Sequence, residues 1–525
     1  MAGSNSAFNA ADYLLDRQVR EGNGDRVAVV TSGRTLSYGE LAAEVHRVAG
    51  GLAAIGVRPE ERVMLCMVDG IEMLTGILGA MRLGAVPVPV STMVTGPELG
   101  KVLADSRARV LCVSDEFSAA AKAAIELAPE VTDVVLDRAD PIHFSTRIKT
   151  HDWTELSTSE AWPAYRTWED SPALWLYTSG TTGEPKGAMH RHASIRAVCE
   201  TYGSQVLGIR DDDRCFSVAK LFFAYGIGNS AFFPLAVGAS SILDPGRPDP
   251  HAVAETVRAG RPTLFFGVPT FYSALLASDI PDDTFSSVRQ AVSAGEPLPA
   301  VIFERFRERF GVEILDGIGS TEALHIFLSN RPGQAVPGTT GVAVPGYDVE
   351  IRDTGGAVID GAGQPGELYV RGPSTAVGYW SRYETTKLVF QGEWLRTGDS
   401  YLRNDDGTYT CLGRFNDMLK AGGIWVSPAE VEQRLLQHPD VAEAAVVAAP
   451  DTDGIDKPVA CVVPAAGREV DERALIEFCR EGLASFKRPR AVVSVAELPK
   501  TATGKIRRNV VRESVRDALL PGALA

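Results

Sequence analysis

The segment Tyr177-Thr-Ser-Gly-Thr-Thr-Gly-Glu-Pro-Lys-Gly187 directly follows the short apolar run Ala173–Leu176. An apolar run that opens into a loop rich in glycine and hydroxyl groups is typical of a buried strand that ends at a ligand site. The glycines free the backbone to turn its N–H groups toward an anion, the hydroxyls add donors, and Lys186 adds a positive charge. No Gly-Lys-Ser/Thr closes the segment, so it is not a P-loop. It predicts a loop that handles a polyphosphate.

Size and composition restrict the class of protein. The chain has 525 residues, of which 45% are hydrophobic and 23% charged, so we expect a globular protein with more than one domain. The net charge of −15 argues against general binding to nucleic acid or to anionic membranes. The cysteines form no C-x-x-C pair and several lie in apolar runs, which predicts buried free thiols in a reducing compartment. We expect a cytoplasmic protein, because the N-terminus lacks the apolar stretch of a secretory signal.

Short apolar runs alternate with helical patterns through the first two-thirds of the chain. Examples are the predicted strands 62–67 and 110–113 and the predicted helices 38–52 and 71–83. This alternation predicts an α/β fold with parallel sheets covered by helices. Residues 221–243 carry no charge, but polar residues and glycines interrupt them, so we expect a buried interior segment rather than a membrane span.

The pattern changes after about residue 338. Residues 338–415 alternate with a period near two and contain turn signals, which predicts an antiparallel, β-rich portion. We therefore expect a large N-terminal domain over residues 1–415. From residue 416 to 525, helices and strands form a small α+β C-terminal domain.

Five further motifs follow the opening segment in order along the chain. They are Ser293-Ala-Gly-Glu-Pro297, Asp316-Gly-Ile-Gly-Ser-Thr-Glu322, Trp394-Leu-Arg-Thr-Gly-Asp399, Gly413-Arg-Phe-Asn-Asp-Met-Leu-Lys-Ala-Gly-Gly423 and Pro499-Lys-Thr-Ala-Thr-Gly-Lys505. The second follows the apolar run 312–315, so Thr321 and Glu322 are predicted at the carboxyl end of a strand, where ligands gather in open α/β sheets. Together the six motifs resemble the adenylate-forming superfamily of acyl-CoA synthetases over essentially the whole chain.

The resemblance implies a reaction and roles for named residues. A carboxylate attacks the α-phosphorus of ATP, pyrophosphate leaves, and a thiol then displaces AMP from the acyl-adenylate. The implied catalytic residues are Lys505, Thr321 and Glu322, with Glu322 and Thr181 facing Mg²⁺. The implied ATP- or AMP-binding residues are Thr178, Ser179, Gly180, Thr181, Thr182, Gly183, Lys186, Ala294, Gly295, Glu296, Pro297, Asp316, Gly317, Ile318, Asp399 and Arg414.

The resemblance also implies that the C-terminal domain rotates between the half-reactions about a hinge at Asn416, where the family usually has Asp or Lys. In the second state coenzyme A would be bound by Lys420, Gly422, Gly423, Lys487 and Arg488. A homodimer is a further expectation.

Two segments indicate the kind of acid. Ala219-Lys-Leu-Phe-Phe-Ala-Tyr-Gly-Ile-Gly-Asn229 and Ala323-Leu-His-Ile-Phe-Leu-Ser-Asn330 resemble aryl-CoA ligases, benzoate-CoA ligases in particular. They imply a flat slot for the aryl acid formed by Phe223, Ala224, Tyr225, Gly319, His325 and Ile326. Ordinary core packing is the alternative for the aromatic run, and a structural histidine is the alternative for His325. The expected partners are therefore an aromatic carboxylic acid, ATP and coenzyme A.

Other functions fit parts of the sequence. A domain that loads a carrier protein, or a ligase for a cinnamate-like or fatty acid, would share every nucleotide motif. The run Gly226-Ile-Gly-Asn-Ser-Ala231 also fits a dinucleotide-binding fingerprint. We expect that match to be accidental, because the helix that must follow would contain Pro234, which costs about 3 kcal/mol or more in a helix interior.

Overall fold

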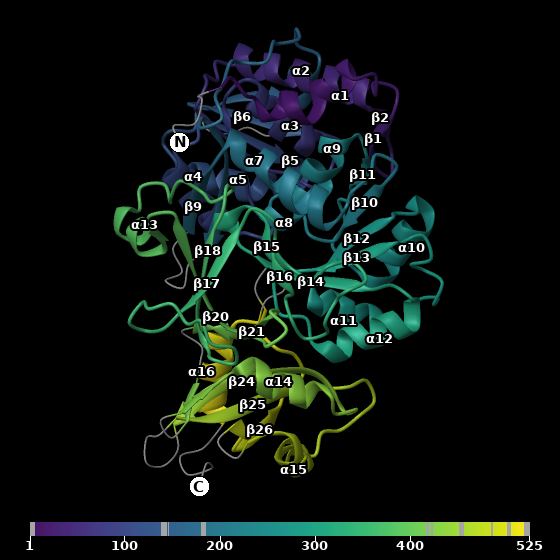
Figure 1. Ribbon diagram of the computed structural model, residues 1–525. Helices are drawn as coiled ribbons and strands as arrows, with labels where there is room; N and C mark the ends of the chain where they lie inside the picture. The colour runs from purple at the N-terminus through teal and green to yellow at the C-terminus, as the bar shows by residue number, and fades with distance from the viewer. Residues whose placement is uncertain are drawn as a thin grey trace.

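The structure is a computed structural model. It describes residues 6–137, 144, 146–179, 185–415, 419–421, 424–450, 456–484, 487–500 and 506–518. Two largely parallel sheets with covering helices form most of the molecule, an antiparallel sheet adjoins them, and the C-terminal elements lie together at one end (Figure 1). The predicted α/β class with an antiparallel portion is confirmed.

The central sheet contains nine strands in the order β16-β15-β14-β13-β12-β10-β11-β1-β2. Its strands are β1 (Val27–Val30), β2 (Thr35–Ser37), β10 (Arg214–Ser217), β11 (Ser240–Ile242), β12 (Leu264–Gly267), β13 (Gln290–Ser293), β14 (Ile314–Gly319), β15 (Ile326–Ser329) and β16 (Val342–Ala343). The run from β14 to β1 is parallel, and β15, β16 and β2 are antiparallel edges. The carboxyl ends of the parallel strands therefore share one edge.

Helices pack on this sheet through apolar faces. They include α2 (Tyr38–Ala54), α8 (Ala224–Ile227), η4 (Gly228–Phe232), α9 (Phe233–Val237), α10 (Pro250–Gly260), α11 (Pro269–Ala277) and α12 (Ala300–Phe310). In α12, Phe303, Phe306 and Phe310 recur at helical spacing and are buried. The ring of Phe306 lies 5.0 Å from that of Tyr272 and 5.3 Å from that of Phe285. Full burial of one such side chain contributes about 1.5–3 kcal/mol.

The second sheet is entirely parallel, in the order β4-β3-β5-β6-β7. Its elements are β3 (Arg62–Cys66), α3 (Ile71–Arg82), β4 (Val86–Pro89), α4 (Gly96–Ser106), β5 (Val110–Ser114), η2 (Asp115–Phe117), α5 (Ser118–Ile125), β6 (Asp133–Asp137), β7 (Lys149–Asp152) and α6 (Trp153–Ser157). Every residue of β5 and of β6 is buried, as expected for parallel strands covered on both faces.

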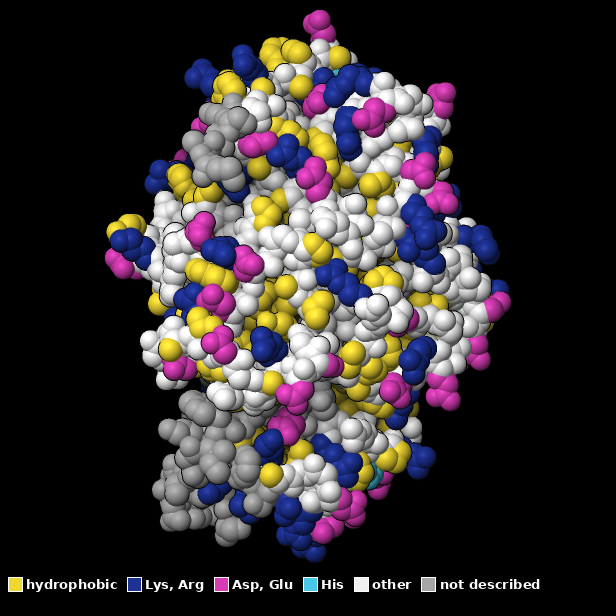
Figure 2. All heavy atoms as spheres, in the orientation of Figure 1, with side chains coloured by type: hydrophobic (Ala, Val, Ile, Leu, Met, Phe, Trp, Pro, Cys, Tyr) yellow, Lys and Arg dark blue, Asp and Glu magenta, His cyan; other side chains and the backbone are white. Residues whose placement is uncertain are grey.

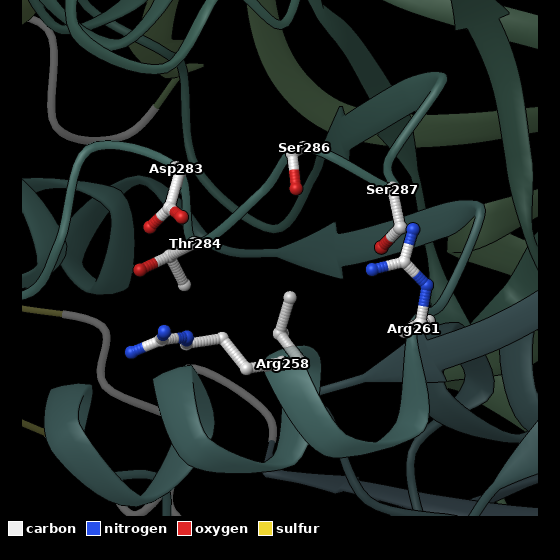
Figure 3. Close-up of a pocket in the computed structure, with 7 residues that line it drawn as sticks. Arg258, Arg261, Asp283, Thr284, Ser286 and Ser287 are labelled. Carbon is white, nitrogen blue, oxygen red and sulfur yellow. The ribbon is translucent and has the colours of Figure 1, made fainter.

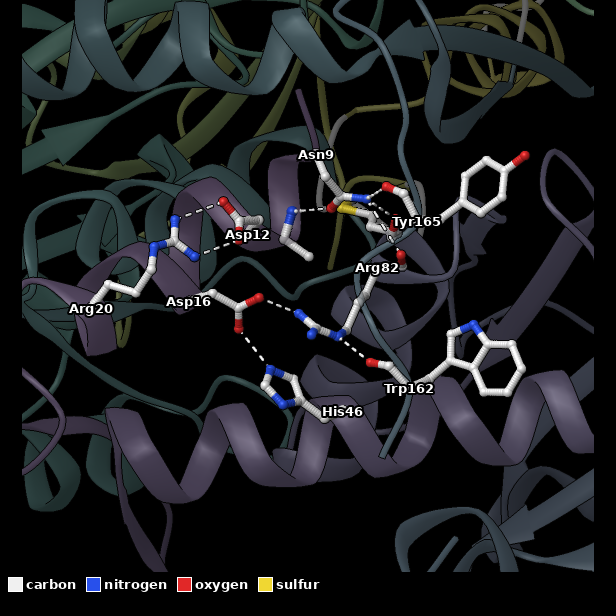
Figure 4. A network of polar contacts seen from close by, with 10 residues as sticks. Asn9, Asp12, Asp16, Arg20, His46, Arg82, Trp162 and Tyr165 are labelled. Atoms are coloured by element: carbon white, nitrogen blue, oxygen red, sulfur yellow. Dashed lines mark hydrogen bonds and ion pairs between the residues drawn. The ribbon is translucent and has the colours of Figure 1, made fainter. Parts of the chain in front are cut away.

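A polar network ties the N-terminal segment to this second sheet (Figure 4). The segment includes η1 (Asp12–Asp16) and α1 (Arg17–Arg20). The amide of Asn9 donates to the carbonyl of Met81 at 3.0 Å and to that of Tyr165 at 3.2 Å. The carboxylate of Asp16 accepts from Arg82 and lies 2.7 Å from Nε2 of His46. These contacts hold the chain start beside the end of α3.

A hairpin and an antiparallel sheet complete the N-terminal part. The hairpin consists of β8 (Pro172–Ser179) and β9 (Pro185–Arg191), followed by α7 (His192–Val198) and η3 (Cys199–Val206). The antiparallel sheet consists of β17 (Asp348–Arg352), β18 (Gly366–Arg371), β19 (Phe390–Gln391), β20 (Trp394–Arg403) and β21 (Tyr409–Arg414), with α13 (Tyr383–Val389). The antiparallel prediction for this part of the chain is confirmed.

The C-terminal elements have apolar cores of their own. They are β22 (Leu419–Ala421), β23 (Ile424–Val426), α14 (Pro428–Leu436), β24 (Val441–Pro450), β25 (Asp456–Pro464), α15 (Glu472–Gly482), β26 (Ala491–Ser494) and α16 (Arg508–Ala518). Two clusters of buried residues lie within this part, at residues 419–492 and 445–515. The boundary after residue 415 stays a prediction, because residues 416–418 lie outside the described ones.

Several local expectations are also settled. The stretch 221–243 is interior rather than membrane-spanning, and no helix among the described residues is long and apolar enough to cross a bilayer. All cysteines are free; six are buried, and Cys411 is partly exposed. On the face shown in Figure 2, basic and acidic side chains are interspersed rather than segregated.

Candidate functional site

The two ends of the phosphate-loop motif lie in the paired strands β8 and β9. Thr178 in β8 pairs with Lys186 in β9, so the two strands bring both ends of the loop together. The ammonium of Lys186 lies 5.7 Å from the ring centroid of Tyr379, within the range of a cation–π contact. The side chain of Ser179 and the predicted residues Gly180, Thr181, Thr182 and Gly183 lie outside the described residues.

Strand β14 carries the next motif to the carboxyl edge of the central sheet. The sequence predicted that this strand ends at residue 315, but it continues to Gly319 because β15 pairs with it. A Cβ at Gly317 would lie 2.9 Å from the carbonyl oxygen of Leu328, and one at Gly319 would lie 2.4 Å from that of His325. The glycines therefore permit the close approach of β15, which places Asp316, Gly317 and Ile318 inside the strand.

The short 3₁₀ helix η5 (Thr321–Ala323) follows β14 and holds the predicted catalytic pair Thr321 and Glu322. The carbonyl of Thr321 lies 2.8 Å from Nε2 of His190, which is buried between the hairpin and this turn. Burial lowers the pKa of His190 to about 4, so the imidazole is neutral at physiological pH and donates to that carbonyl. The side chain of Glu322 is half-buried, and its Oε1 accepts a hydrogen bond from the Tyr379 hydroxyl at 2.6 Å.

Residues 294–297, which are predicted to bind ATP or AMP, follow the neighbouring strand β13. Ser293 at the end of β13 is in register with Asp316 of β14, so residues 294–297 leave the sheet beside the start of the Asp316 motif. Gly295 has a φ of +97°, a conformation that favours glycine. The backbone N–H of Leu298 approaches Oδ2 of Asp316 at 3.5 Å. Burial raises the pKa of the Asp316 carboxyl well above its ordinary value.

Asp399 and Arg414, two of the predicted ATP- or AMP-binding residues, lie in the antiparallel sheet. Asp399 of β20 is in register with Arg414 of β21, and Nη1 of Arg414 lies 3.2 Å from Oδ1 of Asp399. Asp399 lies within β20, directly after Gly398, which has a φ of +75°. The side chain of Asp399 is 14% exposed and that of Arg414 56%, so both are accessible to a ligand.

The aromatic block surrounds His325 at the start of β15. Its ring lies 5.6 Å from that of Tyr225, 4.6 Å from that of Phe233 and 5.1 Å from that of Tyr202. Its Nε2 lies 3.2 Å from the amide oxygen of Asn229. Burial lowers the pKa of His325 to about 3, so the imidazole is neutral and donates from Nε2 to Asn229.

The remaining predicted acid-contacting residues come together around this histidine. Phe223, Ala224 and Tyr225 begin α8 and are only partly buried, whereas the rest of that helix is buried. The hydroxyl of Tyr225 donates to the carbonyl of Val292 in β13 at 3.1 Å. Gly319 pairs directly with Ile326 across β14 and β15. Helix α8 and the β14–β15 hairpin thus bring the predicted aryl slot to the same sheet edge as Glu322.

The dinucleotide-binding fingerprint has no matching structure. The stretch 226–231 lies within the consecutive helices α8 and η4 rather than in a loop between a strand and a helix. Pro234 stands in the first turn of the next helix, α9, where proline is tolerated. Gly228 packs tightly against His325, and this packing accounts for one of the two glycines of the fingerprint without a bound nucleotide.

The C-terminal predictions are placed only in part. Asn416, Gly422, Gly423, Lys505 and the side chain of Lys420 lie outside the described residues. Lys487 forms an ion pair with Glu430 at 2.6 Å, and Nε of Arg488 donates to the carbonyl of Leu483 at 3.0 Å. Both basic side chains thus contact their own domain, and their role toward coenzyme A stays a prediction.

Sequence reasoning missed the contribution of four side chains to the site. Tyr379 reaches Glu322 from a distant segment whose Gly-Tyr-Trp sequence carries no polar signal. Phe233 lies in the stretch 221–243, which was predicted only as a buried interior segment. Tyr202 lies in η3, which contains none of the motifs. Asn229 was noted as an interruption of an uncharged run, and a lone amide in such a run is a usable signal, because buried amides need partners.

A small surface cavity of about 210 Å³ lies elsewhere, between α10 and the segment before β13 (Figure 3). Its lining residues are Val257, Arg258, Arg261, Asp283, Thr284, Ser286 and Ser287. None of the predicted site residues lines it, and small-molecule sites are typically about 300–1,000 Å³. The candidate site is therefore the sheet edge described above.

Comparisons with known proteins agree with this geometry. A family model described as AMP-binding enzyme matches residues 15–380, and one described as AMP-binding enzyme C-terminal domain matches residues 430–505. A benzoate–CoA ligase of Thauera aromatica is 44% identical, covering 97% of this chain and 96% of the relative. A 4-hydroxybenzoate–CoA/benzoate–CoA ligase of Rhodopseudomonas palustris is 43% identical, covering 96% of this chain and 94% of the relative.

Solved structures show the same likeness. The anthranilate CoA ligase AuaEII in complex with anthranoyl-AMP has a TM-score of 0.92 at 38% identity, covering 98% of each chain. A benzoate CoA ligase from Burkholderia xenovorans LB400 has a TM-score of 0.89 at 41% identity, covering 96% of this chain and 100% of that chain.

Proposed function

Because this chain belongs to the AMP-binding enzyme family, and its near-full-length relatives include aryl-CoA ligases, we propose that it is one of these ligases. It converts benzoate, or a hydroxy- or amino-substituted benzoate, through an aroyl-adenylate into the aroyl-CoA thioester. ATP is cleaved to AMP and pyrophosphate. The observation that carries the proposal is the meeting of the aromatic enclosure of His325 with Glu322 at one edge of the central sheet.

The first half-reaction joins the acid to AMP. A carboxylate oxygen of the acid attacks the α-phosphorus, the bond to the bridging oxygen breaks, and pyrophosphate leaves with that electron pair. Negative charge accumulates on the phosphate oxygens as this happens. The motifs predict that Lys505 and the hydrogen-bond donors of the phosphate loop stabilise that charge. Asp399 accepts hydrogen bonds from the ribose hydroxyls, and Arg414 lies beside it.

Glu322 fits the requirements of a Mg²⁺ ligand. Mg²⁺ in nucleotide sites is usually held by one or two carboxylates together with phosphate oxygens and water. Tyr379 occupies one oxygen of Glu322, and no donor within the described ranges reaches the other. Those ranges contain no group of three or more side chains that would hold a metal without the nucleotide. When bound, Mg²⁺ supplies positive charge to the phosphates, and Thr181 is its second proposed contact.

The acid slot is flat because α8 begins with the small Ala224 between Phe223 and Tyr225. We expect an aryl ring to bind between this turn and the Gly319–Ile326 pair, whose strands approach closely because Gly319 carries no Cβ. Neutral His325 presents no charge to the ring. An enclosure lined by aromatic rings favours a ring over a flexible chain, because rigid stacking orders few rotatable bonds.

The second half-reaction transfers the aroyl group. The thiolate sulfur of coenzyme A attacks the acyl carbon, the carbon–oxygen bond to the phosphate breaks, and AMP leaves. The glycine pair Gly422 and Gly423 would admit the pantetheine chain close to the backbone after the C-terminal domain has turned about Asn416.

The test is AMP release from ATP with Mg²⁺ and a panel of acids, each with and without coenzyme A. The panel is benzoate, 2- and 4-hydroxybenzoate, 2-aminobenzoate, cinnamate and octanoate. We expect AMP release that depends on coenzyme A with one or more benzoates. Pyrophosphate exchange without stimulation by coenzyme A would instead indicate a loader of carrier proteins. A preference for octanoate would refute the aryl slot.

A further inference from the structure

Residues 376–382 form a segment, called the clasp, that joins the β8–β9 hairpin to Glu322. Met189 of β9 exchanges two backbone hydrogen bonds with it: its N–H donates to Gly378 at 3.0 Å, and its carbonyl accepts from Val377 at 2.9 Å. The N–H of Trp380 donates to the carbonyl of Gly187 at 2.9 Å. The clasp therefore pairs with β9 like an added strand of the β8–β9 hairpin.

The clasp also forms two hydrogen bonds with Glu322. The N–H of Ala376 donates to the backbone carbonyl of Glu322 at 2.8 Å, and the Tyr379 hydroxyl donates to its Oε1 at 2.6 Å. The second distance is that of a strong, charge-assisted O–H···O⁻ bond.

The ring of Tyr379 also faces Lys186, whose ammonium lies 5.7 Å from its centroid. One side chain thus contacts a predicted phosphate-binding cation through its face and the predicted metal-facing carboxylate through its hydroxyl. Its backbone is fixed as well, because Tyr379 forms a bridge with Ala188 and its N–H donates to Oγ1 of Thr386 at 3.0 Å.

Neighbouring contacts prevent the clasp from shifting along the hairpin. The Trp380 ring lies 4.8 Å from that of Trp175 in β8, and its Nε1 donates to the carbonyl of Asp105 at 2.9 Å. The carboxylate of Asp105 also accepts from Tyr177 at 2.7 Å and from Arg382 at 2.7 Å. Tyr177, at the start of the phosphate-loop motif, and the clasp are therefore anchored to the same residue of α4.

We propose that Tyr379 is a positioning residue for adenylation, which orients Glu322 toward the nucleotide-bound Mg²⁺ through its hydroxyl and Lys186 toward the phosphates through its ring. The proposal rests on the proposed ATP chemistry of the site. It assigns separable roles to two parts of one side chain, and substitutions can remove them one at a time.

The experiment measures equilibrium binding of the non-hydrolysable analogue α,β-methylene-ATP by calorimetry, with Mg²⁺ and with EDTA. Tyr379→Phe removes the hydroxyl and keeps the ring. We expect affinity with Mg²⁺ to fall about tenfold, since a hydrogen bond to a charged group is lost, while affinity in EDTA changes by less than about twofold. Tyr379→Leu removes the ring as well and should also weaken binding in EDTA.

Tyr38→Phe is the matched control, because Tyr38 is fully buried and its hydroxyl donates to the carbonyl of Ala239 at 2.6 Å, remote from the nucleotide motifs. It should bind the analogue like the wild type under both conditions. Equal losses of Tyr379→Phe with Mg²⁺ and with EDTA, or no loss in either, would overturn the positioning role. Failure of the wild-type protein to bind the analogue at all would refute the proposed function itself.

Discussion

The two sides of the site differ in how they are built. On the acid side, His325 is buried among three aromatic rings, its Nε2 contacts the amide of Asn229, and its pKa is lowered to about 3. On the nucleotide side, Glu322, Asp399 and Arg414 are partly exposed and interact with other polar groups. Glu322 and His325 are separated in the chain only by Ala323 and Leu324. We therefore expect the acid side to select by shape in an apolar setting and the nucleotide side to act through charge close to water.

The largest expected effect lies on the nucleotide side. Lys505→Ala should lower the rate of adenylation about 10²–10³-fold or more, because a preorganised cation no longer stabilises the phosphate charge. Thioester formation from a synthetic aroyl-adenylate should change little. Pyrophosphate exchange measures the first step, and release of AMP from the adenylate measures the second.

Lys500→Ala is the control for that variant, because Lys500 lies in the same motif and pairs with Glu443 at 2.7 Å. Its adenylation rate should remain close to that of the wild type. An equal loss in both lysine variants would mean that charge in general, rather than Lys505, supports the reaction.

Asp399→Ala should raise the KM for ATP about 10–100-fold, because hydrogen bonds between a charged carboxylate and the ribose are lost. The KM for the aryl acid should hardly change, since Asp399 belongs to the nucleotide side. Steady-state kinetics with ATP and the aryl acid varied in turn measure the two KM values separately. Asp348→Ala, which removes an exposed ion pair with Arg371 in the same sheet, is the control. A rise of both KM values in Asp399→Ala would show that the two sides are not independent.

Gly228→Ala tests the acid side by shape alone. The new Cβ would lie 2.4 Å from Cδ2 of His325, so the imidazole must move in a closely packed enclosure. We expect kcat/KM for benzoate to fall about tenfold while the KM for ATP is unchanged. Gly33→Ala, where a Cβ meets nothing within 4 Å, should match the wild type. An unchanged preference among ring substituents would argue against His325 as part of the slot.

The smallest effect concerns pH. The folded pKa of His325 is about 3, below the ordinary value of about 6.5, so only the unfolded chain takes up its proton as the pH falls from about 6.5. This group therefore lowers the free energy of unfolding by at most about 1.4 kcal/mol for each pH unit below that value.

Urea denaturation between about pH 4 and pH 7 measures this slope. His325→Gln should make this slope shallower by that amount. The KM of the wild type for the acid should also show no step near pH 6.5, because His325 stays neutral. A step that disappears in His325→Gln would contradict the neutral, apolar acid side.

The sequence predicted the elements well where the local signals were strong. The alternation of apolar runs and helical patterns identified the parallel sheets, because strands buried on both faces read as continuous apolar runs. It missed the extension of β14 to Gly319, because residues 316–319 contain two glycines and a charge and look like a loop. Their extended conformation depends on β15, which pairs only after the chain has turned back through His325.

By itself the sequence determined the order of the motifs, the residue types at the nucleotide side and the aromatic character of the acid block. These are properties of short segments, since a phosphate loop or a carboxylate after a strand needs only its local neighbours. Only the tertiary structure decided that Tyr379 holds Glu322, that Asn229 and Phe233 enclose His325, and that Lys487 pairs with Glu430. Each of those contacts joins segments far apart in the chain, and no local spacing or composition encodes which distant surfaces will meet.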